Sequence, residues 1–234
     1  MLGTIVNALA ILAGGTLGIF LKGGLSEKVA KNVMDGLALC VLFIGASNII
    51  GVTDKLDSTS FLVIIISTVI GAVVGEKIDI DKKIENLGNN IEKKLNNKGG
   101  QVSKGFVTAS LLFCIGAMAI IGSLESGLVG NHKTLFAKSV LDGITSIIFA
   151  SSLGIGVLLS AASVFVYQGL ITLCASSLKG VLIADVINNM TAIGGFLIIA
   201  LALNMLNATK IKVANLLPAI FLPIIYQFII TIIN

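Results

Sequence analysis

Two aspartates in apolar surroundings are the strongest candidates for chemistry in this chain. Asp35 and Asp142 each follow a lysine by four residues, Lys31 and Lys138, and each is expected about one turn inside an apolar helix. Side chains four residues apart share a helix face, so each lysine can pair with its aspartate. A carboxylate within a membrane is costly and is therefore a candidate for binding a substrate or an ion. In the structural alternative, the two charges neutralise each other near the lipid headgroups.

A second polar group lies in the last third of the chain. It consists of Asp185, Asn188, Asn189 and Thr191, followed by the adjacent Gly194 and Gly195. Asn188 and Thr191 are three residues apart and share a helix face. Adjacent glycines cost about 1 kcal/mol each in a helix interior, so they can mark an unwound stretch whose backbone binds an ion. Close packing of helices through small residues explains them equally well.

The residue types that catalysis requires are not grouped in the sequence. The chain has one histidine, His132, which together with Glu125 is expected in an external connection, so it offers a metal no more than a lone ligand. The three cysteines each lie within an apolar run, which favours packing over a disulfide or a zinc site. We therefore expect no enzyme, no metal and no cofactor.

The composition indicates that a lipid bilayer is the solvent. The chain is 56% hydrophobic and 12% charged, whereas soluble domains are about 25% charged. Its lysines lie beside apolar runs without an aromatic-basic platform, so nucleic acid is not an expected partner. The first charge is Lys22, and no basic segment precedes the first apolar run. Residues 1–21 are therefore expected to be a retained span rather than a signal peptide.

Long charge-free runs predict the membrane spans. Each is long enough for one helix of about 20 residues, except 143–178, which is long enough for two and has a natural break near Gly154 and Gly156. The prediction is an all-α membrane protein with eight helices, at roughly 3–21, 31–51, 59–76, 105–123, 137–158, 162–178, 183–206 and 212–233. Seven helices, with one long bent fifth helix, are the main alternative. The runs are solidly apolar, unlike the strands of a membrane barrel.

Lysine distribution predicts the orientation. With eight spans, twelve of the 16 lysines fall on the side that holds residues 77–104, and four fall on the other. The positive-inside rule then places this connection in the cytoplasm and both termini outside. Within it, apolar residues recur every three or four positions, at Ile80, Ile84, Leu87, Ile91 and Leu95. This period predicts an amphipathic helix on the inner membrane surface, or alternatively one packed against another protein.

The sequence also repeats internally, at an offset of 107. Residues 30–36 (AKNVMDG) match residues 137–143 (AKSVLDG), and Gly15 matches Gly122 in the same register. Helices 1–3 and 4–6 are therefore predicted duplicates, and three spans per unit would insert them with opposite orientations. The expected domains are 1–76 and 105–178 for the two repeats, 77–104 for the cytoplasmic connection, and 179–234 for a C-terminal helix pair.

Several segments resemble a known family. They are GSLESG at 122–127, AKSVLDG at 137–143, FASSLGIGV at 149–157, YQG at 167–169 and MTAIGG at 190–195. Together they resemble the uncharacterised bacterial membrane family that includes the YdfK and YqgA proteins. The resemblance implies a protein of the bacterial plasma (inner) membrane, discussed as a transporter, with no established substrate.

These observations predict a transporter or channel-like permease for an ion or a small polar solute. The alternative is a non-transporting oligomeric scaffold or sensor that acts through the amphipathic helix, and a membrane enzyme ranks third. The expected partners are the lipid bilayer and the solute, with homo-oligomerisation left open.

Overall fold

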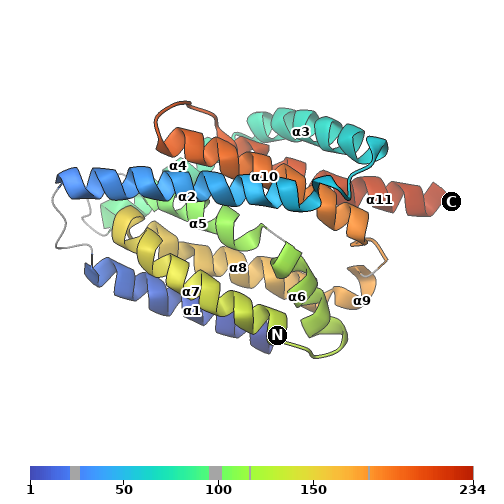
Figure 1. Ribbon diagram of the computed structural model, residues 1–234, viewed down its shortest axis with the longest axis horizontal. Helices are drawn as coiled ribbons and strands as arrows, with labels where there is room; N and C mark the ends of the chain where they lie inside the picture. Colours follow the sequence, from blue (N-terminus) through green and yellow to red (C-terminus); the bar gives the residue numbers. More distant parts are fainter. Residues whose placement is uncertain (22–26, 95–101, 116, 179, 234) are drawn as a thin grey trace. The chain divides into compact units, whose positions relative to one another are not determined.

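The computed structural model describes residues 1–21, 27–94, 102–115, 117–178 and 180–233, and these residues form helices joined by turns (Figure 1). No strand occurs in these ranges. The helices are α1 (Leu2–Leu21), α2 (Glu27–Thr53), α3 (Ser58–Ile78), α4 (Ile80–Lys94), α5 (Val102–Cys114), α6 (Ala117–Leu128), α7 (Lys133–Leu153), α8 (Gly156–Leu173), α9 (Ala175–Leu178), α10 (Ala184–Met205), the 3₁₀-helix η2 (Val213–Phe221) and α11 (Leu222–Ile233). The prediction of an all-helical chain is confirmed for the described residues.

Six of these helical segments are long and apolar enough to cross a membrane. They are α1, α3, α7, α8, α10 and the continuous stretch Val213–Thr231, which joins η2 to α11. Helices α5 and α6 pass the same test only as a pair, and the apolar part of α2 is the shorter segment Ala38–Thr53. The expected arrangement of eight spans and its orientation stay predictions.

Two of the expected boundaries need correction. The fourth span was expected to be one helix over 105–123, but α5 ends at Cys114 and α6 runs on to Leu128 with its axis 59° from that of α5. The hydropathy of the sequence is continuous across this bend and therefore gives no signal of it. The predicted break in the run 143–178 is confirmed at Gly154, whose φ of 76° lies in the left-handed region that favours glycine.

The chain divides into two compact units. Unit 1 comprises Met1–Leu37, Lys83–Cys114 and Met118–Ser176, and unit 2 comprises Ala38–Lys82, Ile115–Ala117 and Ser177–Asn234. Helices α1, α5, α7 and α8 pack together in unit 1, whereas α3, α10, η2 and α11 pack together in unit 2. The long helix α2 contributes residues to both units. The division of the chain into repeats and a C-terminal pair stays a prediction.

Glycines set the close packing of α1 against α7 within unit 1. A side chain at Gly14 would collide with the backbone oxygen of Gly143, and one at Gly18 would collide with that of Ile147. The Ser146 hydroxyl donates a hydrogen bond to the backbone oxygen of Ile11 across the same interface, at 3.2 Å. Small residues allow membrane helices to approach this closely. The glycines of α1 are therefore packing residues.

Candidate functional site

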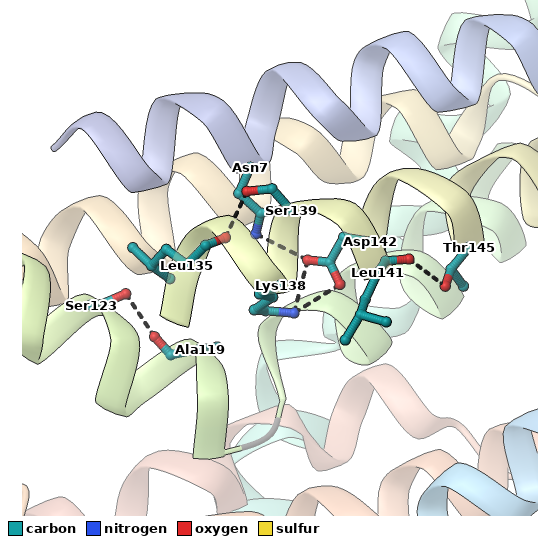
Figure 2. A network of polar contacts seen from close by, with 9 residues as sticks. All are labelled: Asn7, Ala119, Ser123, Leu135, Lys138, Ser139, Leu141, Asp142 and Thr145. Carbon is teal, nitrogen blue, oxygen red and sulfur yellow. Dashed lines mark hydrogen bonds and ion pairs between the residues drawn. The ribbon is translucent and has the colours of Figure 1, made fainter. Parts of the chain in front are cut away.

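The Lys138–Asp142 pair forms a buried ion pair on α7. The Lys138 ammonium lies 2.9 Å from Asp142 Oδ1 and 2.8 Å from Oδ2, and each residue is only 6% exposed (Figure 2). Both side chains extend from the same helix, one turn apart, so the pair forms without help from any other element. The predicted pairing at this repeat is thus confirmed, and it lies in the interior of unit 1 rather than on its surface.

Asn7 of α1 completes this cluster. Its Nδ2 donates a hydrogen bond of 3.0 Å to Asp142 Oδ2, and its side chain is fully buried (Figure 2). The sequence analysis did not single out Asn7 as a site residue. The signal was available, because Asn7 is a carboxamide within the charge-free apolar run 1–21. The close approach of α1 and α7 that Gly14 permits brings Asn7 to Asp142.

The cluster has a defined electrostatic character. The positive charge of Lys138 balances the negative charge of Asp142, so the polar site carries no net charge. Taking two charges out of water is costly, and the attraction between them offsets that cost only when the geometry is good and hydrogen bonds satisfy the remaining atoms. Asn7 supplies such a hydrogen bond. The thiol of Cys114, at the end of α5, lies within electrostatic range of both charges, so the bend between α5 and α6 begins beside the cluster.

The equivalent aspartate of the first repeat behaves differently. Asp35 is half-buried on α2, and Lys31 is exposed. Within the part of the chain that the structure describes, the ion pairs are Lys138–Asp142 and Lys212–Glu76, and Lys31 forms none with Asp35. Nor does a hydrogen bond or ion pair join Asp35 to Asp142. Sequence identity between the two motifs therefore does not extend to the same local contacts.

The second polar group lies on α10 in unit 2. Asp185 is exposed and Asn188 is half-buried, whereas Asn189 is buried and its Oδ1 has no hydrogen-bond partner. Thr191 is buried and donates to the backbone oxygen of Ile187 in its own helix, at 2.7 Å. The structure therefore identifies Asn189 as the buried amide of this group. Whether these residues bind a solute stays a prediction.

Gly194 and Gly195 are continuous with the rest of α10. The helix is regular from Ala184 to Met205, so it is not unwound at the glycine pair. A side chain at Gly194 would collide with Ile115, and one at Gly195 would press against Ile49 and the backbone oxygen of Gly45. These contacts favour the interpretation of the two glycines as packing residues.

A polar network ties the start of α4 to two other helices of unit 2. Asn215 of η2 accepts a hydrogen bond from the backbone N–H of Asp81 and donates one to Glu76 Oε2, at 2.7 and 2.6 Å. Lys212 donates to the other oxygen of Glu76, at 2.6 Å. This hydrogen bond raises the pKa of Lys212 above its ordinary value. The predicted helix in the 77–104 connection is confirmed over Ile80–Lys94, and Leu95 lies outside the described residues.

The α6–α7 connection differs from the expected solvated loop. Glu125 lies within α6 rather than in the connection, because α6 continues to Leu128. It accepts a hydrogen bond from the Thr134 hydroxyl at 2.7 Å. His132 is half-buried, with its Nδ1 2.9 Å from the Ser126 hydroxyl. The two side chains therefore fasten the end of α6 to the start of α7.

Comparison with known proteins gives a family but no activity. Residues 2–228 match the family described as "Protein of unknown function (DUF554)". The chain is 33% identical over 231 residues to the uncharacterized membrane protein YdfK of Bacillus subtilis, covering 98% of this chain and 97% of that protein. It is 28% identical over 229 residues to the uncharacterized protein YqgA of Escherichia coli, covering 95% and 94%. No solved structure matches. The chain therefore belongs to the DUF554 family, whose member in Bacillus subtilis is described as a membrane protein.

Proposed function

We propose that this protein is a small transporter or channel-like permease for an ion or a small polar solute in the bacterial plasma membrane. The observation that supports this most is the buried cluster of Lys138, Asp142 and Asn7 within a bundle of membrane-length helices. Charged side chains at such positions are rare, because hydrocarbon does not compensate them, and they usually mark the path of a solute.

The bend between α5 and α6 adds a second line of support. Transporter sites commonly lie where a membrane helix is interrupted, because the interruption provides backbone groups for binding and a joint for movement. Here Cys114 at the end of α5 lies within electrostatic range of Lys138 and Asp142. In the proposed mechanism, the solute binds beside the cluster, and movement around the α5–α6 bend opens it to one side of the membrane.

The proposal includes eight membrane crossings with both termini outside. The crossings comprise the six long segments, the bent α5–α6 pair as one span, and α2 as another. It also includes the inverted repeat of helices 1–3 and 4–6, which the sequence motif at an offset of 107 supports. An experimental structure tests the repeat, because the two halves should then superpose after a rotation of about 180° in the membrane plane.

Flux measurements test the proposed activity. The purified protein, reconstituted into liposomes, is assayed with a panel of cations, anions and amino acids beside empty liposomes. We expect Asp142→Asn to change the pH or ion dependence of uptake and Asn188→Leu to abolish uptake without preventing folding. Thr145→Val is the control on α7, because Thr145 is exposed and bonded only to its own helix. If no solute moves above the empty liposomes, the proposal is wrong.

One observation favours a second candidate, a membrane sensor. The network around Asn215 links the amphipathic helix α4 to both α3 and η2. A change at the membrane surface could be passed through these bonds to the spanning helices. Absence of flux together with a dependence of α4 on lipid composition would favour this candidate.

A further inference from the structure

Gln168 is a buried amide for which the structure provides no partner. Its side chain lies on α8 with no exposed surface, and neither Oε1 nor Nε2 forms a hydrogen bond. Asn7 is fully buried too, and its Oδ1 is unpaired. Leaving a buried polar atom without a partner is destabilising, and most such atoms in folded proteins are satisfied by protein or water. Two carboxamides in this condition indicate a position that binds something.

The packing of α1 against α8 places these two residues at the same level. The hydroxyls of Thr4 and Thr172 lie 3.5 Å apart, and a side chain at Gly15 would collide with Leu158. The residue numbers run in opposite directions, so the two helices are antiparallel. Asn7 lies about 4.5 Å along α1 from Thr4, and Gln168 lies about 6 Å along α8 from Thr172, in the same direction.

Both amides also lie on the contacting faces of their helices. Asn7 is three residues from Thr4 and Gln168 is four residues from Thr172, and these spacings keep residues on one helix face. The Thr4–Thr172 contact therefore brings the Asn7 face of α1 toward the Gln168 face of α8.

The chemistry of the position follows from how Asn7 is held. Asp142 is an acceptor, so Asn7 must present its NH₂ group to it, and this leaves the Asn7 oxygen facing elsewhere. Gln168 offers one acceptor oxygen and one NH₂ donor. The position thus supplies both donors and acceptors, and the nearby Lys138–Asp142 pair adds no net charge. An ion would lose its hydration here without gaining a counter-charge, whereas an uncharged polar molecule loses much less.

We propose that Asn7 and Gln168 form the binding position for a small uncharged solute that both donates and accepts hydrogen bonds, such as an amide or a polyol. This inference rests on the proposed function and narrows it from any ion or polar solute to this class. The Asn7 oxygen accepts from the solute, while the Gln168 amide both donates to it and accepts from it. The Lys138–Asp142 pair orients Asn7 without contacting the solute.

The first test compares uncharged solutes with ions in reconstituted liposomes. Light scattering after an osmotic step measures the flux of urea, formamide, glycerol and water, and tracer uptake measures Na⁺, K⁺ and Cl⁻. We expect wild type to pass at least one of the uncharged solutes faster than empty liposomes, and Gln168→Leu to reduce that flux by about tenfold or more. Ser160→Ala is the matched control, because Ser160 is equally buried on α8 but its hydroxyl is bonded within its own helix.

The outcomes separate this inference from the proposed function. Flux of ions alone, unchanged in Gln168→Leu, overturns the inference and leaves the transporter standing. Flux of an uncharged solute that Gln168→Leu does not alter also overturns the inference. Flux of water alone, with amides and polyols excluded, assigns the position to water and overturns the amide or polyol class. Absence of any flux above empty liposomes overturns both.

A binding measurement adds a readout that does not depend on transport. The chain has three glutamines, Gln101, Gln168 and Gln227, so ¹⁵N-glutamine labelling gives few side-chain amide signals. The signal lost in Gln168→Leu is that of Gln168, and we expect it to shift on titration with formamide or glycerol. Gln168→Leu should also be at least as stable as wild type, since it removes unpaired buried atoms. A Gln168 signal that is insensitive to every solute overturns the inference.

Discussion

Asn7 of α1 and Asp142 of α7 are joined by a hydrogen bond of 3.0 Å although 135 residues separate them in the chain. The bond connects the first helix to the one buried ion pair found among the described residues. Because Lys138 and Asp142 lie on the same helix, movement between helices cannot separate their backbones by much. Movement of α1 against α7 would instead break the Asn7 bond. Asn7 is thus the part of the cluster that responds to rearrangement of unit 1.

Removing one charge of the buried pair should destabilise the protein strongly. Asp142→Asn leaves the Lys138 charge uncompensated, and breaking a buried pair in this way costs about 3–5 kcal/mol. The double variant Lys138→Met, Asp142→Leu should recover most of that loss, since it leaves no buried charge. Unfolding in a detergent titration measures both. Asp35→Asn is the matched control, and a loss as large as that of Asp142→Asn would contradict the contrast between the two repeats.

Gly14→Ala should separate α1 from α7. The added methyl group would collide with the backbone oxygen of Gly143, so the helices must move apart and the Asn7–Asp142 bond should weaken. Gly36→Ala on α2 is the control, because a side chain there meets nothing within 4 Å and alanine favours a helix by about 1 kcal/mol. Thermal unfolding should show a loss for the first variant and a small gain for the second. Equal effects would show that Gly14 has no special packing role.

The sequence was sufficient to predict the helices but not the contacts between them. Apolar runs without charge leave α-helices as the only economical structure, and this holds for α1, α3, α7, α8 and α10. The Lys138–Asp142 pair was also predictable, since both partners lie on one helix. The contact of Asn7 with α7 depends on helix packing, which a single sequence does not reveal. Asp35 shows the same limit, because an identical motif at a less buried position does not form the pair.

Acid should loosen the first turn of α3. The hydroxyl and the backbone N–H of Ser60 donate hydrogen bonds to Asp57, the N-cap, and hold the pKa of Asp57 below its ordinary value of 3.8. A lowered folded pKa means that the carboxylate stabilises the folded state above pH 3.8, and that this contribution is lost as the pH falls through the folded value. Protection of the Ser60 amide from hydrogen exchange should fall over that window. Asp57→Asn should keep the cap without this pH dependence.

Cysteine accessibility tests the orientation. In a variant without native cysteines, Asn131→Cys should react with a membrane-impermeant reagent added outside, whereas Asn90→Cys should react only after the cells are opened. The excess of lysine on the side of residues 77–104 is the physical reason. The reverse pattern would invert the orientation. A cytoplasmic C-terminus with the same pattern would favour seven spans over eight.

Asn215 should control the position of α4. Its Oδ1 accepts from the backbone N–H of Asp81, so it satisfies one of the donors that a helix leaves unpaired in its first turn. Asn215→Ala removes this bond and the bond to Glu76, and we expect faster hydrogen exchange in the first turn of α4. Asn215→Asp separates the two effects, because it keeps the acceptor for Asp81 but loses the donor to Glu76. If the aspartate variant exchanges as fast as the alanine variant, the contact with Glu76 rather than the cap on Asp81 holds α4 in place.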